Sequence, residues 1–288
     1  MTRHEGAPLS ALLVMAGTAL FGTVGTARVL GPDVPSAAIA AARLGASALL
    51  FVALALLLGH AAALARTVRL PWAYLAGAGQ AGFQVCFLAA VVNVGVALGT
   101  LIAIGCTPLL AGLMTRQVTR TWAVATAVSV PGLALLVGAD PGEADALGIA
   151  SALGAALSYA TYIVASRHLV AGGATGMGVL AGIFTVSAVV LAPFLVVVDP
   201  GDLWTPAGLV TVGYLAVVPT VLAYHLFNAG LRGVPASTAA TLGLTEPVVA
   251  AALGVLVLGE TLGGAGVVGA VLVLAGLFVL VTRQRAEQ

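Results

Sequence analysis

Apolar residues fill this chain in ten long stretches, each close to the roughly 20 residues that an α-helix needs to cross a bilayer. Short turns rich in Gly, Pro, Asp or Arg separate the stretches, and no segment between them is long enough for a soluble domain. The pattern predicts an all-α integral membrane protein. Its ten transmembrane helices are expected near 9–28, 36–58, 71–92, 95–115, 121–139, 146–166, 176–198, 206–228, 234–258 and 262–282.

The first stretch raises the question of a signal peptide. It follows Arg3 and continues for about 18 residues before Arg28, longer than a typical signal core of roughly 7–15 residues. Further spans follow it, rather than a soluble chain. We therefore expect the first helix to be retained.

The arginines predict the orientation of the chain. With ten helices, the two termini and the second, fourth, sixth and eighth loops share one side of the membrane. That side holds Arg3, Arg66, Arg69, Arg116, Arg120, Arg167, Arg232, Arg283 and Arg285. On the other side, Arg28 is the only arginine. Because cytoplasmic loops are enriched in basic residues, we expect both termini in the cytoplasm and the protein in the cell (inner or plasma) membrane.

Composition supports lipid as the outer solvent and excludes some chemistry. Hydrophobic residues make up 61% of the chain and charged residues only 7%, against about a quarter charged in soluble domains. All 11 cationic side chains are arginine, which excludes a Walker-type phosphate loop and a lysine Schiff base. The net charge of +1 gives no indication of nucleic acid. The 37 glycines fit closely packed membrane helices.

The ten helices divide into two sets of five at the acidic loop 140–145. The expected halves are 9–139 and 146–282, and an odd number of helices per half inverts the second half relative to the first. Pro108 of CTPLLAGL and Pro247 of TEPVVAAA each lie in the fourth span of their half. Inverted repeats of this kind are a recurring basis of secondary transporters, with the solute held at the membrane midplane.

Several segments resemble a known family. They are TEPVVAAALGVLVLGETLGGAGVVGAVLVLAGLFVL from Thr245 to Leu280, ALFGTVGTARVL in the first span, and AAIAAARLGASALLF in the second. Together they resemble the EamA branch of the drug/metabolite transporter superfamily, over about 10–282. Two positions depart from that pattern: no tryptophan precedes Gly22, and Thr121 stands where the second half has Glu260.

The resemblance carries several implications. It implies two repeats of five helices around a central cavity. Helices one to four and six to nine would line this cavity, with helices five and ten peripheral. It also implies solutes such as amino acids, purines, other metabolites or cationic drugs, more often exported than imported.

Two ionisable side chains fall deep inside predicted spans, where a charge is costly and usually faces a cavity or a partner. Glu246 lies about twelve residues into the ninth span and precedes Pro247. It is a candidate for binding a cationic group or carrying a coupling proton, or else for holding helices together beside a proline kink. Arg43 lies roughly 12 Å into the second span. It is a candidate for binding a substrate carboxylate, or for snorkelling or pairing with Asp33.

Neutral polar residues supply further candidates. Gln80 and Gln84 share a face of the third helix, and Tyr159 and Tyr162 share a face of the sixth. They suit a polar solute as well as hydrogen bonds between helices. His225 clusters with Tyr224 and Asn228 in the eighth span, either for transport chemistry or as an interfacial hydrogen bonder. No residues show catalytic or metal-ligand spacing, and we expect no cofactor and no metal.

The leading functional interpretation is a secondary transporter of a small organic solute, such as an amino acid, a related metabolite or a drug. We expect it to export the solute by alternating access rather than to act as an enzyme. The expected partners are the solute and the lipid bilayer, with protons as a candidate coupling ion besides solute exchange or the membrane potential. The alternative is an intramembrane enzyme acting on a lipid, which generally needs paired acids or a His/acid cluster.

Overall fold

The computed structural model describes residues 6–116, 118–138, 145–173 and 176–283. Helices account for all the regular secondary structure of this part of the chain. Ten of its segments are long and apolar enough to cross a membrane, which confirms the predicted class. They are Pro8–Leu30, Ser36–Leu57, Pro71–Val96, Leu98–Thr115, Arg120–Val137, Ala146–Ala171, Met177–Val197, Pro206–Gly230, Ala236–Leu258 and Gly264–Thr282.

Among the first five spans, the first is interrupted once, and the third and fourth are joined by a sharp turn at a single glycine. The first span consists of α1 (Gly6–Phe21) and α2 (Thr23–Leu30), separated at Gly22. The second is α3 (Ser36–Leu57), and the short helix α4 (Ala61–Thr67) leads to α5. The 45-residue α5 (Pro71–Thr115) contains the third and fourth spans, with non-helical dihedrals at Gly95 between them. The fifth span is α6 (Arg120–Val137).

The second five spans are interrupted more often. The sixth span is α7 (Ala146–Ala171), and the seventh is α8 (Met177–Leu191) with α9 (Phe194–Val197). After the 3₁₀ turn η1 (Gly201–Trp204), the eighth span comprises α10 (Pro206–Ala216), the π-helical stretch η2 (Val217–Leu222) and α11 (Ala223–Gly230). The ninth comprises α12 (Ala236–Leu242) and α13 (Thr245–Leu258), and the tenth is α14 (Gly264–Arg283).

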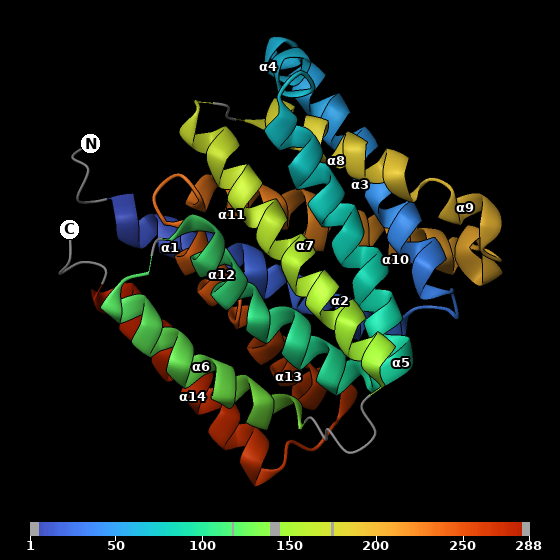
Figure 1. Cartoon of the computed structure of the whole chain (residues 1–288). Coiled ribbons are helices and arrows are strands. Elements are labelled where there is room, and N and C mark those ends of the chain that lie inside the picture. Colours follow the sequence, from blue (N-terminus) through green and yellow to red (C-terminus); the bar gives the residue numbers. More distant parts are fainter. Residues whose placement is uncertain (1–5, 117, 139–144, 174–175, 284–288) are drawn as a thin grey trace.

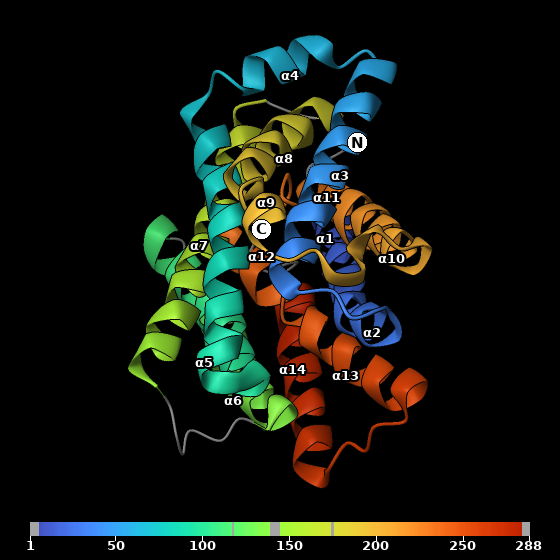
Figure 2. The same cartoon turned by 90° about the vertical axis from the view of Figure 1, so that its right-hand side faces the viewer.

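The spans form one bundle in which the two halves of the chain are interleaved. α5 packs along α7, α6 along α14, α3 along α8 and α1 along α11. Figure 1 shows α6 and α14 side by side along one edge, the peripheral position that the resemblance implies for helices five and ten. Figure 2 shows α4 lying across one end of the bundle, between α3 and α5.

The first and last described helices place the chain ends. α1 begins and α14 ends on the same side of the bundle (Figure 1). We call this side the terminal face and the other side the opposite face. Arg3, Asp140, Glu143 and Arg285 lie outside the described residues. The boundary between the halves is described only at Asp145, whose carboxylate accepts a hydrogen bond from Gly148 N at 3.2 Å and caps α7.

Large apolar side chains cover the outside of the bundle. Leu57, Val196 and Leu256 each expose more than four-fifths of their surface. Largely exposed aliphatic side chains on several helices require an apolar solvent, so their surroundings are lipid. In the interior, small residues allow the helices to pack closely against one another. Added side-chain carbons at Gly17 and Gly132 would lie within 3.0 Å of backbone atoms of α11 and α14.

Candidate functional site

A cavity of about 590 Å³ lies in the centre of the bundle. Its walls come from both halves of the chain: α1, α2, α3 and α5 on one side, α7, η2, α11 and α13 on the other. The seventh span contributes no lining residue among those described, whereas Leu136 and Val137 at the end of α6 do. The lining that the resemblance implies is therefore wrong at two helices. The fifth helix lines the cavity, and the seventh does not do so with any described residue.

The mouth of the cavity is on the opposite face. Val96 beside the Gly95 turn, Val137 at the end of α6, and Glu260 after the end of α13 all line it. Each of these positions ends a span that starts at the terminal face. The floor consists of Tyr159 and Tyr224, which lie further toward the terminal face.

Glu246 lines the cavity at an irregular turn in the ninth span. α12 ends at Leu242 and α13 begins at Thr245, so Glu246 stands in the first turn of a helix that starts inside the membrane. The positive end of the helix dipole favours a carboxylate there. Pro247 occupies the same turn, where its missing N–H costs no helical hydrogen bond. Gly243 and Leu244 keep right-handed helical dihedrals, and Glu246 N donates to the Gly243 carbonyl at 3.0 Å, so the span bends beside Pro247 rather than stopping.

Close packing holds this helix start against the first span. A side-chain carbon added at Gly22 would lie 2.6 Å from the Glu246 carbonyl oxygen and 3.0 Å from Ala250 N. Only glycine permits this approach, so the break between α1 and α2 lies beside the break between α12 and α13. Half-helices that end at a binding site near the membrane midplane are typical of secondary transporters.

Arg43 faces the same cavity from α3. It is half-buried and lines the wall, and its guanidinium lies in the neighbourhood of the Glu246 carboxyl group and the Tyr224 hydroxyl. Its Nε is buried without a hydrogen-bond partner. The side chains described on this wall include no nitrogen–oxygen pair within 4.0 Å between Arg43 and Glu246. The expected alternative pairing with Asp33 is not seen, because Asp33 lies instead near Arg28, which donates to the Val34 carbonyl at 2.6 Å.

The neutral candidates divide between the cavity and the packed region beneath it. Gln84 and Tyr159 line the cavity, and the Tyr159 hydroxyl has no hydrogen-bond partner. Gln80 is fully buried beside the Tyr224 hydroxyl, and neither of its amide atoms has a hydrogen-bond partner within 3.5 Å. Tyr162 is also fully buried, and its hydroxyl accepts a hydrogen bond from Asn228 Nδ2 at 2.8 Å.

His225 lies apart from these residues. Its side chain is exposed and borders a small separate pocket with Asn228 and Arg232, near the terminal face. The neighbouring Tyr224 points inward instead. A step of one residue turns a side chain about 100° around a helix, which separates the two positions.

Sequence reasoning passed over other lining residues. Phe83 and Phe87, one turn apart on α5, stack with ring centroids 5.4 Å apart, and their four-residue spacing was the available signal. Thr100 and Pro219 also line the cavity. Glu260 also lines the cavity, from the exposed turn between α13 and α14, where it lies against Gly254.

The site thus combines one guanidinium, one carboxylate and a few neutral hydrogen-bonding groups on largely apolar walls. Such a cavity can bind a small solute that carries charges of both signs, because each charge meets an opposite one away from bulk water. The described residues contain no group of three or more His, Cys, Asp or Glu side chains suited to a metal ion.

Several known proteins similar to this chain are named as transporters or exporters. A protein of Bacillus subtilis (strain 168) named uncharacterized transporter YwfM is 33% identical, over 96% of this chain and 95% of its own length. The threonine/homoserine exporter RhtA of Escherichia coli (strain K12) is 30% identical, over 87% of this chain and 83% of its own. A protein crystal structure with 20% identity shares the fold, with a TM-score of 0.81 over 97% of this chain and 99% of that one.

The second half of the chain also matches a family profile, that of the EamA-like transporter family, over residues 146–282. The likeness to YwfM and RhtA extends over nearly the whole chain. The chain therefore belongs to the EamA-like transporter family of the drug/metabolite transporter superfamily, and it is a multi-pass membrane transporter.

Proposed function

We propose that this transporter exports a small zwitterionic solute of the amino-acid class by alternating access. The observation that carries the proposal is that Arg43 and Glu246 line one cavity without a direct ion pair between them. A solute carboxylate can then bind the guanidinium while its ammonium group binds the carboxylate. Each contact is a charge-assisted hydrogen bond, the stronger kind in a site of low dielectric.

The names of the relatives support the same class of solute. RhtA is named a threonine/homoserine exporter, and a probable amino-acid metabolite efflux pump of Salmonella typhimurium is 44% identical over 66 residues. The cavity volume of about 590 Å³ leaves room for such a solute and for water around it.

The energy source follows from what the chain lacks and from Glu246. Without a lysine-bearing phosphate loop, uphill export draws on an ion gradient, solute exchange or the membrane potential. Glu246 is a carboxyl group inside the membrane that can take up and release a proton, so protons are the proposed coupling ion. If both termini lie on the cytoplasmic side of the cell membrane, the cavity opens to the outside. This is the state in which an exporter releases its solute.

Binding measurements with modified ligands test the two charge contacts. A thermal-shift screen of the purified protein against the twenty amino acids selects a ligand, since stabilisation reports binding to the folded state. Its methyl ester lacks the carboxylate, and its N-acetyl derivative lacks the ammonium. The wild type should bind each derivative at least about tenfold more weakly than the amino acid.

Matched variants locate each contact. Arg43→Gln should bind the amino acid and its ester about equally, whereas Glu246→Gln should bind the amino acid and its N-acetyl derivative about equally. Arg43→Lys keeps the charge without the planar fork and should retain intermediate discrimination. If Arg43→Gln still prefers the acid to its ester as strongly as the wild type does, the solute carboxylate does not bind Arg43.

A further inference from the structure

Beneath the cavity floor lies a group of buried polar side chains that the charged pair does not use. It comprises Gln80 from α5, Tyr162 and Ser166 from α7, and Asn228 from α11, which we call the polar seam. All four are at most 8% exposed. Ser166 lies one turn beyond Tyr162 along α7, and Asn228 one turn beyond Tyr224 along α11. The seam therefore extends from the cavity floor toward the terminal face.

The polar seam is poorly satisfied in this conformation. The Asn228 Oδ1 atom is buried without a hydrogen bond. The Gln80 amide and the Ser166 hydroxyl lie close to the Tyr224 and Tyr162 hydroxyls but have no hydrogen-bond partner within 3.5 Å. Buried polar groups are almost always hydrogen-bonded, and each one left unmatched costs stability. Several such groups along one path suggest that they are matched in another conformation.

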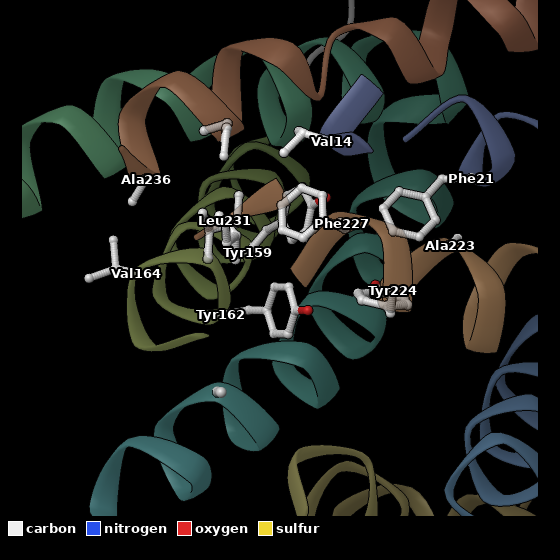
Figure 3. Close-up of a cluster of buried hydrophobic side chains, with 14 of the residues drawn as sticks. Val14, Phe21, Tyr159, Tyr162, Val164, Ala223, Tyr224, Phe227, Leu231 and Ala236 are labelled. Atoms are coloured by element: carbon white, nitrogen blue, oxygen red, sulfur yellow. The ribbon is translucent and has the colours of Figure 1, made fainter. Parts of the chain in front are cut away.

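Aromatic side chains cover the seam on the cavity side. The Tyr224 ring lies 5.4 Å from that of Tyr162, 4.8 Å from Phe184 and 4.7 Å from Phe21, measured between centroids. Figure 3 shows Tyr162, Tyr224, Phe227 and Phe21 gathered where α7, α11 and α1 meet. The bond from Asn228 Nδ2 to the Tyr162 hydroxyl ties α11 to α7 below this cover.

The helices α1 and α11, which carry Phe21 and Tyr224 of this cover, pack tightly against each other. Side-chain carbons added at Gly17 and Gly230 would lie 2.6 and 2.5 Å from carbonyl oxygens of α11 and α1, so the two helices are packed backbone to backbone. Both are joined to the outer halves of their spans by irregular links at cavity depth: Gly22 for α1, and the π-helical η2 for α11. π-helical turns and such breaks are common at functional sites.

We propose that the polar seam is a second solute-binding surface, which α11 uncovers toward the terminal face when it separates from α7. An exported solute would meet its neutral hydrogen-bonding groups before it reaches Arg43 and Glu246. The seam would thus favour solutes whose uncharged part can donate and accept hydrogen bonds. This inference rests on the proposed export by alternating access.

Cysteine accessibility tests the surface. Cys86 and Cys106 are free thiols and are first replaced by alanine. A membrane-impermeant maleimide added from the terminal face should then label Ser166→Cys. Ala165→Cys, at the same depth but among packed apolar side chains with 1% exposure, is the matched control and should react at least about tenfold more slowly. Equal rates at the two positions, or no labelling of Ser166→Cys, would overturn the proposal.

Protection separates a solute surface from a water-filled passage. A mixture of the nineteen standard amino acids other than cysteine, whose own thiol would consume the maleimide, should slow labelling of Ser166→Cys from the terminal face, and labelling of Gln84→Cys in the cavity from the opposite face. Protection of Gln84→Cys alone would overturn the seam as a solute surface and leave the proposed function standing. Protection at neither position would overturn both.

The bond between α11 and α7 gives a second readout. Tyr162→Phe removes the hydroxyl that accepts from Asn228 and keeps the ring beside Tyr224. Losing one neutral hydrogen bond shifts such an equilibrium by about two- to tenfold, so labelling of Ser166→Cys should accelerate by that factor. An unchanged or slower rate would show that this bond does not hold α11 closed.

Discussion

At the scale of single residues, the functional interpretation depends mainly on two ionisable side chains inside the membrane. Glu246 and Arg43 could be singled out from the sequence because charged side chains are rare and costly within spans. Their meeting in one cavity could not be, since it depends on how α3 and α13 pack. His225 shows the opposite limit. Its position one residue from Tyr224 did not reveal that it faces outward.

Glu246→Gln should abolish the pH dependence of transport, because an amide cannot take up or release the proton that a carboxyl group can. The protein should fold, since the two side chains have nearly the same shape. We expect transport at neutral pH to fall at least about tenfold through the lost charge-assisted contact. Uptake assays across pH in proteoliposomes measure both effects. Glu260→Gln, at the exposed mouth, is the control and should keep most of the activity and its pH dependence.

Gly22→Ala should destabilise the protein by about 1–3 kcal/mol, the usual cost of overpacking. The new methyl group would lie 2.6 Å from the Glu246 carbonyl oxygen, which cannot move without shifting α13. Gly25→Ala is the matched control, since nothing lies within 4 Å of its added carbon. Thermal unfolding in detergent compares the two. Equal stability of both variants would mean that α1 and α13 are not in close contact.

At the scale of helices, hydropathy predicted the spans to within a few residues. In lipid, the backbone N–H and C=O groups must form hydrogen bonds within the protein, so a long apolar segment is almost always a helix. The predicted second span, 36–58, became Ser36–Leu57. Hydropathy did not predict the break at Gly243–Leu244 or the π-helical turn at Val217–Leu222. An irregular turn inside an apolar segment leaves its average hydropathy unchanged. Contacts with other helices offset the free-energy cost of such a turn, and hydropathy does not report these contacts.

Gly95→Ala should destabilise the turn between the third and fourth spans. Gly95 has φ 77° and ψ 166°, a region that residues with a side chain essentially never adopt, at a cost of about 1–3 kcal/mol. No atom lies near its added carbon, so the effect would be purely conformational. Gly213→Ala, inside α10 with similar free space, should instead stabilise by roughly 0.5–1 kcal/mol. Unfolding curves of the two variants should therefore shift in opposite directions.

At the scale of the whole molecule, ten crossings and a central cavity follow from the spans and their packing. The inversion of residues 146–282 relative to 9–139 remains a prediction, as does the cytoplasmic placement of the termini. Nearly all the arginines outside the spans belong to the terminal face, and this bias is the basis for the predicted orientation of the chain in the membrane. The outward opening of the cavity depends on it.

Asp145→Cys tests the orientation. This exposed residue starts α7 on the opposite face, and in a background without Cys86 and Cys106 it should react with an impermeant maleimide added outside intact cells. Arg69→Cys, exposed in the second loop, should react only after the membrane is opened. The reverse pattern would place the termini outside and turn the cavity toward the cytoplasm.

Counterflow in proteoliposomes of the purified protein measures transport of an amino-acid solute most directly. Vesicles loaded with the unlabelled amino acid selected by thermal shift should accumulate the labelled form transiently against its gradient, and Arg43→Gln and Glu246→Gln should each lower the rate of accumulation at least about tenfold. Absence of counterflow by the folded wild type, or conversion of lipid without net movement of solute, would contradict it.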